Sequence, residues 1–292
     1  MILPFDVILG VDWSGSKAAR LPGLRVAACK PDDEPPMLLR GPRAGGLWRR
    51  MDVLGMLVER IATGQRVLIG FDFAFAYAFE DREAYFPGAP DTPRDARSLW
   101  AYVERLCRAA PDLYGGAVYA ATSPVAAHYL TPAGRGKHYT RRQRVTEVAC
   151  AAVTSPHPVF KCVGAANVGT GSLAGMRLLH RVTTILGRQV SVWPFDGIAP
   201  TSATVCEIFP RLAVKQAGLN PTRWREPGVI DAILRYHGSA AYDGGEPLDT
   251  EDKADAVLAA AALRARAGID SVWRAPSTEP ASAREGWIFG VT

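Results

Sequence analysis

The sequence contains no apolar run near the roughly 20 residues that span a bilayer. Histidine and cysteine are also scarce, with five of each in 292 residues. The cysteines form no Cys-x-x-Cys pair, and the histidines show neither His-x-x-x-His nor His-Glu-x-x-His spacing, so the common zinc sites are not indicated. Scattered cysteines in odd number are typical of reduced thiols, and we expect a cytoplasmic protein without a membrane partner.

The basic N-terminal region of a signal peptide is missing as well. The first 16 residues are apolar, contain Asp6 and Asp12, and have no lysine or arginine. We therefore expect a first strand there and not a targeting segment. Lysine is rare throughout: 6 lysines stand against 28 arginines, and the net charge is +5. Arginine suits bidentate contacts to phosphate, so a polyanionic partner is one explanation. The other explanation is GC-rich coding, which also makes a sequence rich in arginine.

The order of elements predicts one α/β domain over residues 1–292. Apolar runs predict strands at residues 5–12, 24–30, 37–40, 66–73, 190–195, 203–209 and 287–291. Helical periodicity and stop residues predict helices at residues 48–63, 96–110, 172–186, 211–217, 227–236 and 250–267. The irregular stretch of about 81–160 is typical of an insertion of helices and loops. The whole favours one sheet with the terminal helix packed on it.

Carboxylates stand inside the apolar segments of this sequence. Asp12, Asp72 and Glu207 fall in three separate predicted strands, and Asp252 and Asp255 share one face of the predicted terminal helix. A buried carboxylate is unfavourable unless it is paired or bound to a metal. Small residues on the same helix face would let the helix lie close to the sheet, which would gather four or five of these acids into one cluster.

Such a cluster predicts Mg²⁺ or Mn²⁺, since carboxylates at close range repel one another without cations. Two ions ~4 Å apart are a common arrangement for phosphodiester hydrolysis. Asp12 would bridge the ions, Asp72 and Asp255 would each complete one coordination shell, and Asp252 and Glu207 would hold metal-bound water.

Structural explanations remain open for each acid. Asp12 can open a turn, and Asp72 can pair with a nearby arginine. Glu207 can pair with Arg211, and Asp252 and Asp255 can favour a helix N-terminus through its dipole.

The motifs GVDWSGS, IGFDFAFA, EIFPR and EDKADAVLAAAAL resemble those of an uncharacterised bacterial and archaeal family of predicted nucleases (domain of unknown function 429). The resemblance covers roughly residues 5–80 and 160–292. It implies a ribonuclease H-like fold: a mixed five-stranded sheet, its first three strands antiparallel, with helices on both faces. It also implies that Asp12 lies on the first strand and Asp72 on the fourth, and we expect these two strands to be neighbours in the sheet.

These observations predict a metal-dependent nuclease or phosphodiesterase. One alternative is a catalytically inactive module of the same fold that binds nucleic acid or protein. Another is an actin-like ATPase or kinase, because residues 12–17 resemble the first phosphate loop of those proteins. The glycine-rich residues 164–175 either hold a phosphate at a helix start or form a tight connection to the helix.

A basic stretch at residues 135–144 is the strongest candidate for contact with nucleic acid. Its predicted phosphate contacts are Arg135, Lys137, Arg141, Arg142 and Arg144. The alternative is a charged loop exposed to solvent. Trp13, which follows Asp12, is a candidate wall of the site.

Overall fold

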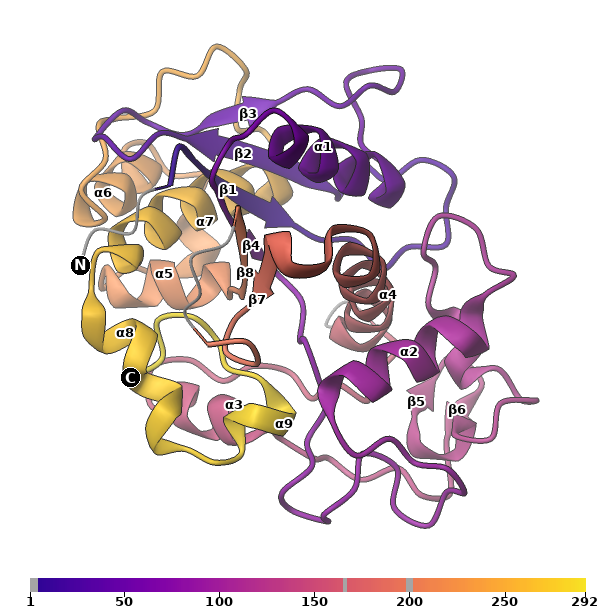
Figure 1. The fold of residues 1–292 in the computed structure, drawn as a ribbon. Coiled ribbons are helices and arrows are strands. Elements are labelled where there is room, and N and C mark those ends of the chain that lie inside the picture. Colours follow the sequence, from indigo (N-terminus) through magenta and orange to yellow (C-terminus); the bar gives the residue numbers. More distant parts are fainter. Residues whose placement is uncertain (1–4, 165–166, 198–201) are drawn as a thin grey trace.

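A mixed six-stranded sheet forms the centre of the molecule in the computed structural model, which describes residues 5–164, 167–197 and 202–292 (Figure 1). The strand order is β3-β2-β1-β4-β8-β7. The strands are β1 (Val7–Asp12), β2 (Arg25–Cys29), β3 (Met37–Leu39), β4 (Val67–Phe71), β7 (Val190–Val192) and β8 (Ala203–Glu207). A separate two-stranded hairpin consists of β5 (Leu130–Thr131) and β6 (Gly134–Arg135).

The first three strands pair antiparallel with one another, whereas β4, β8 and β7 run parallel to β1. The predicted α/β class, with a mixed sheet, is therefore confirmed. The sheet has six strands instead of five because β7 adds to the outer edge of β8. The predicted strand at 287–291 is wrong. Ile288 makes a single parallel bridge to Glu207, and the chain turns at Gly290, whose φ is +99°.

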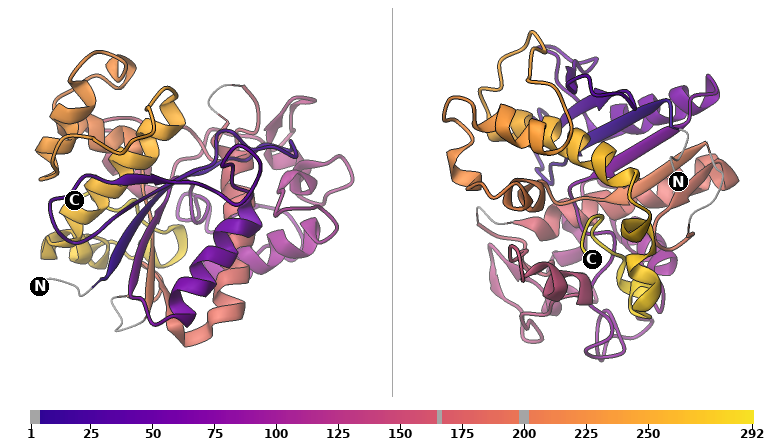
Figure 2. Two further views of the ribbon diagram at one scale, coloured as in Figure 1. Left: turned by 90° about the horizontal axis from the view of Figure 1, so that it is seen from above. Right: turned by 90° about the vertical axis from the view of Figure 1, so that its left-hand side faces the viewer.

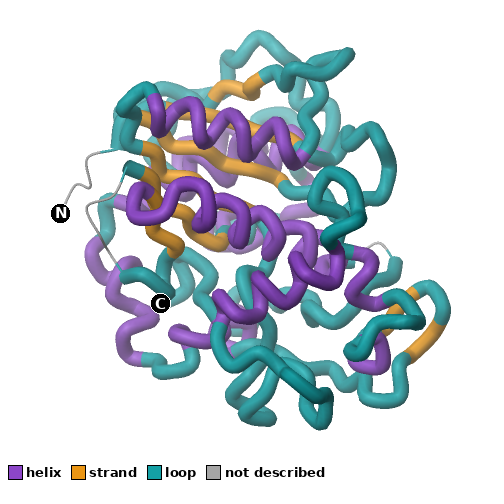
Figure 3. Tube along the Cα trace, turned by 45° about the vertical axis from the view of Figure 1, so that its right-hand side comes forward, coloured by secondary structure: helices purple, strands orange, loops and turns teal. Residues whose placement is uncertain are grey.

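Helices cover both faces of the sheet, as predicted (Figures 2 and 3). The longer helices are α1 (Arg50–Ala62), α2 (Ala96–Cys107), α4 (Val168–Leu186), α6 (Val229–Tyr236) and α7 (Glu251–Ala267). The shorter ones are α3 (Val145–Cys150), α5 (Pro210–Gln216), α8 (Asp270–Arg274) and α9 (Ser282–Glu285). Brief 3₁₀ turns lie at Gly116–Tyr119, Ala126–His128, Gly187–Gln189, Pro221–Arg223 and Ala275–Thr278. No helix of the described residues is long and apolar enough to cross a membrane.

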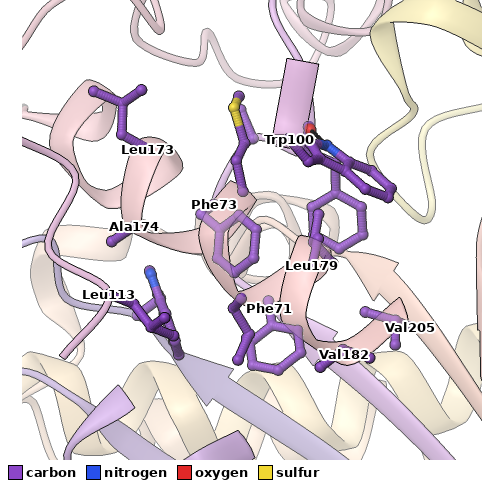
Figure 4. Close-up of a cluster of buried hydrophobic side chains, with 14 of the residues drawn as sticks. Phe71, Phe73, Trp100, Leu113, Leu173, Ala174, Leu179, Val182 and Val205 are labelled. Carbon is purple, nitrogen blue, oxygen red and sulfur yellow. Dashed lines mark hydrogen bonds between the residues drawn. The ribbon is translucent and has the colours of Figure 1, made fainter. Parts of the chain in front are cut away.

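Alternation along the strands separates two apolar cores. Side chains at odd positions of β1 and β4, such as Leu9 and Phe71, pack with α1, α2 and α4. Figure 4 shows part of this core around Phe71, Phe73 and Trp100. Side chains at even positions, such as Ile8 and Leu68, pack with α5, α6, α7 and the C-terminal segment. All five cysteines are buried and free, in agreement with the expected reduced thiols.

Helix α7 lies directly on β1, because the strand carries glycine where the helix crosses it. A Cβ placed at Gly10 would lie 2.6 Å from the carbonyl oxygen of Ala256 and 2.4 Å from the backbone nitrogen of Ala260. Alanines on the facing side of α7 complete this close approach. The crossing directs the first turn of α7 toward the carboxyl end of β1.

The segment between β4 and α4 adds no described strand to the main sheet. It contains α2, which packs along α4, then the hairpin and α3. Helix α4 begins at Val168, four residues before the predicted start, because the Asn167 side chain accepts a hydrogen bond from the Thr170 amide. Residues 165–166 of the glycine-rich stretch lie outside the described residues.

Candidate functional site

Asp12 and Asp72 lie side by side at the carboxyl ends of two neighbouring parallel strands. Asp12 is the last residue of β1, and Asp72 directly follows β4. The Asp72 amide donates to the carbonyl oxygen of Val11 at 3.0 Å, which fixes the two chain segments together. The prediction that these acids come from adjacent strands is confirmed. Asp12 is buried and Asp72 is half-buried.

The first turn of α7 brings two further acids to the same place. Thr250 caps the helix by accepting a hydrogen bond from the Lys253 amide, and Asp252 and Asp255 follow within the first turns. Both are half-buried. The carboxylate of Asp252 lies against the turn before β2, where a Cβ added to Gly23 would be 3.3 Å from its Oδ1. We call Asp12, Asp72, Asp252 and Asp255 the acidic cluster.

The charges of the acidic cluster act on one another. Burial raises the pKa of Asp12 well above its usual value, and the charges of Asp255, Asp72 and Asp252 raise it further. A hydrogen bond to Asp252 contributes in the same direction, because it favours the protonated form of Asp12. Asp12 therefore retains its proton to higher pH than an isolated carboxylate.

The pKa values of Asp72 and Asp255 are raised in the same way. Burial, followed by the charge of Glu207, raises the pKa of Asp72 to about 7. Burial also raises the pKa of Asp255, and the charge of Asp72 adds to the shift, while the charge of Arg211 opposes it. Such repulsion needs protons or cations to balance it.

Glu207 is held in an ion pair outside the acidic cluster, although its charge reaches Asp72, and its predicted contact with metal-bound water is corrected. In the register, Glu207 is opposite Phe71 and so shares the sheet face opposite to that of Asp12. Arg144 donates to both of its oxygens, at 2.7 and 2.5 Å, and the Phe75 amide donates at 3.0 Å. Glu207 therefore forms a buried ion pair, with Arg144 as partner and not Arg211.

The basic stretch divides into buried and exposed side chains. Arg144 is buried between Glu207 and Glu147. Arg142 is buried too: it donates to Asp81 at 2.9 Å and to the carbonyl oxygens of Tyr85 and Ala78. The predicted phosphate contacts of these two arginines are corrected, because their donors already bind protein acceptors.

The other three predicted contacts remain at the surface. Arg135, Lys137 and Arg141 have exposed side chains. Arg135 lies in the hairpin, where its guanidinium stacks on Tyr139. Their contact with nucleic acid stays a prediction.

A cavity of about 170 Å³ opens beside Asp72. Trp13 lines it, as do Asn167 and Val168 at the start of α4 and the Arg144–Glu207 pair. Gly15 lets the loop after β1 pack closely against α4, because it has no Cβ. A Cβ there would lie 2.3 Å from the backbone nitrogen of Gly171. Trp13 is thus a wall of the site, in agreement with the sequence analysis.

Within the described parts of the chain, no group of three or more His, Cys, Asp or Glu side chains stands ready to hold a metal ion. The acidic cluster is close enough for strong repulsion, yet its oxygens do not converge on one point. The predicted ligands Asp12, Asp72 and Asp255 are brought together, and Glu207 is not.

The comparisons with known proteins add no relative: no family model, no curated protein and no solved structure matches the chain.

The sequence analysis did not select His157 or Arg211 as site residues. His157 lines the cavity, and the charge of Arg211 reaches both His157 and Asp255. His157 lies in a stretch of irregular loop, where no periodicity relates it to the strands. Pro210 could have indicated the position of Arg211, because a proline at the first position of a helix marks where α5 begins after β8.

Proposed function

We propose that this protein is a metal-dependent phosphodiesterase that cleaves nucleic acid through its acidic cluster. The observation that carries the proposal is the meeting of four carboxylates from three elements. Pairing of β1 with β4 places Asp12 beside Asp72, and the crossing of α7 at Gly10 adds Asp252 and Asp255. Their mutual repulsion is unfavourable for stability, which is typical of residues kept for chemistry.

The order of the strands supports a ribonuclease H-like fold. Strands β3-β2-β1-β4-β8 have the mixed arrangement that the resemblance implies, with the first three antiparallel and the acids at the ends of the first and fourth. On this proposal, β7 is an addition at the sheet edge.

The donor set suits a hard divalent cation, because all four side chains offer carboxylate oxygens. Asp12, Asp72 and Asp255 would hold Mg²⁺ or Mn²⁺. Since no described group of three already stands in ligand geometry, binding requires these side chains to close toward a common point. A bound cation would polarise the phosphate and activate water.

The protein's own groups would orient and shield this chemistry. The hydrogen bond between Asp12 and Asp252 restrains Asp12, and Trp13 covers the side of the site next to the β1 loop. The Arg144–Glu207 pair supports the chain after Asp72 through the Phe75 amide. These contacts hold the acidic cluster in place beside the cavity.

The size of the cavity disfavours the ATPase alternative. At about 170 Å³ it is smaller than the roughly 300–1,000 Å³ typical of pockets that enclose a whole ligand. One phosphate group fits such a volume, whereas a nucleoside triphosphate does not.

Cleavage assays test the proposal. Labelled RNA, DNA, hybrid and branched substrates are incubated with Mg²⁺ or Mn²⁺ and with wild type, Asp12→Asn or Asp6→Asn. Asp6 is the matched control, because it lies at the other end of β1 in an exposed pair with Arg66. We expect wild type and Asp6→Asn to cleave and Asp12→Asn to lose at least about 10²-fold in rate. Absence of cleavage of every substrate, or equal rates for wild type and Asp12→Asn, would overturn the proposal and favour a binding module.

A further inference from the structure

Basic side chains lie near the cavity along the chain, because Lys161 and Arg211 follow the cavity-lining residues Val159 and Phe209 by two positions each. His157 lines the cavity, and burial together with the charges of Lys161, Arg211 and Arg141 lowers the pKa of His157. Three cations from different segments therefore lie within electrostatic reach of one imidazole. We call Arg141, His157, Lys161 and Arg211 the basic rim.

No described salt bridge involves a residue of the basic rim. Arg142 and Arg144 each pair with acids, but Arg141, Lys161 and Arg211 form no described salt bridge or side-chain hydrogen bond. Arg211 and Arg141 are exposed, so solvent or a ligand can reach them. Unpaired arginines gathered at a cavity suit an anionic ligand.

The cavity also offers a buried donor without a partner. The indole Nε1 of Trp13 has no hydrogen-bond acceptor in the described structure, although the side chain is only 8% exposed. Trp13 lines the cavity together with the residues that open α4, whose N-terminal end carries the positive end of the helix dipole. A buried indole N–H normally finds an acceptor.

The position of the basic rim relates it to the acidic cluster. The charge of Arg211 acts on Asp255 of the cluster as well as on His157 of the rim. The cavity has both His157 of the rim and Asp72 of the cluster on its wall. A ligand there has an acidic side and a basic side within one small volume.

We propose that the basic rim binds one phosphate group of the substrate at the cavity and so positions the chain beside the acidic cluster. The inference rests on the proposed function, since it assigns substrate-binding residues to that site. Arg211 and Arg141 supply charge, and His157 supplies an uncharged N–H at neutral pH. The volume of about 170 Å³ admits a phosphate group and excludes a base pair.

Binding without turnover tests the proposal. Fluorescence anisotropy measures the affinity of a labelled single-stranded oligonucleotide, RNA or DNA, in EDTA at several salt concentrations. The variants are Arg211→Gln, His157→Ala and the control Arg188→Gln. Arg188 is exposed and lies beyond the far end of α4, ~28 Å along the helix from the cavity.

We expect Arg211→Gln to weaken binding by about tenfold and to reduce the salt slope by about 0.7, as for one lost phosphate contact on a single strand. His157→Ala should weaken binding with little change in slope, because the imidazole is uncharged. Arg188→Gln should match wild type. Equal affinities for all four proteins, or no binding by wild type, would overturn the basic rim as a phosphate site.

Competition separates a phosphate site from general charge attraction. Inorganic phosphate should displace the oligonucleotide from wild type more strongly than chloride of equal ionic strength, and this difference should vanish in Arg211→Gln. Equal displacement by the two salts would contradict a phosphate site. Thermal unfolding of Arg211→Gln should match wild type, since the side chain is exposed.

The design distinguishes failure of the inference from failure of the proposed function. Loss of binding in Arg211→Gln without any cleavage by wild type would support the basic rim and refute the nuclease. Cleavage by wild type with unchanged binding in Arg211→Gln would support the nuclease and refute the basic rim.

Discussion

Gly10 of β1 lies directly beneath Ala260 of α7, with space for a hydrogen and none for a methyl group: an added Cβ would be 2.4 Å from the Ala260 backbone nitrogen. The contact sets the height of α7 above the sheet. Because Asp252 and Asp255 are in the first two turns of the same helix, it also sets where they meet Asp12.

Gly10→Ala should therefore destabilise the fold and disturb the acidic cluster together. The new methyl group meets backbone atoms, which cannot rotate away, so we expect a loss of at least about 1–3 kcal/mol in the free energy of unfolding. Urea unfolding followed by circular dichroism measures the loss. Stability equal to wild type would show that α7 does not depend on this contact.

Gly55→Ala is the matched control for that substitution. Gly55 is on the exposed side of α1, and a Cβ there meets nothing within 4 Å. Alanine favours a helix interior over glycine, so this variant should gain about 0.5–1 kcal/mol.

Removing a charge from the acidic cluster should stabilise the protein at high pH when divalent cations are absent. The pKa of Asp72 is about 7 in the folded protein against an ordinary value of 3.8, so the folded state binds more protons between these pH values. Stability therefore falls as pH rises from about 4 to about 7 and stays low above that. Asp72→Asn removes this loss.

The expected gain for Asp72→Asn at pH 9 is on the order of 4 kcal/mol as an upper bound, and it should be near zero at pH 4. Urea unfolding of wild type and variant at both pH values, in EDTA, measures it. A variant less stable than wild type at pH 9 would show that the Asp72 charge is compensated in the folded protein.

Arg144 should matter for stability and not for binding of phosphate. Its guanidinium is buried between Glu147 and Glu207, and Arg144→Met leaves two buried carboxylates without their cation. We expect a loss of about 3–5 kcal/mol. Chemical unfolding checks the value, and Arg135→Gln, at an exposed position, should stay within about 0.5 kcal/mol of wild type.

Much of the framework follows from local patterns in the sequence. The apolar runs that end in Asp12 and precede Asp72 predicted buried neighbouring strands, and the alanine-rich stretch predicted α7. Spacing on one helix face also predicted that Asp252 and Asp255 approach the sheet together. These features depend on periods of two and 3.6 residues, which a sequence displays directly.

Local patterns in the sequence could not predict which residues form ion pairs across long stretches of the chain. Arg144 and Glu207 are 63 residues apart, and only the fold shows that the arginine is buried beneath the site and not exposed in a basic loop. The face of Glu207 follows from its register opposite Phe71, which depends on strand pairing. The charge of Arg211 reaches His157 for the same reason: irregular segments are positioned by tertiary contacts alone.

The most direct test of the metal-dependent site is a crystal of the wild-type protein soaked in Mn²⁺ and measured at a wavelength where manganese scatters anomalously. The account predicts an anomalous peak about 2.0–2.3 Å from carboxylate oxygens of Asp12 and Asp72, with Asp255 closing on it, and no such peak in Asp12→Asn. Absence of a peak among these acids in a wild-type crystal soaked at millimolar Mn²⁺, or a peak of equal height in Asp12→Asn, would contradict it.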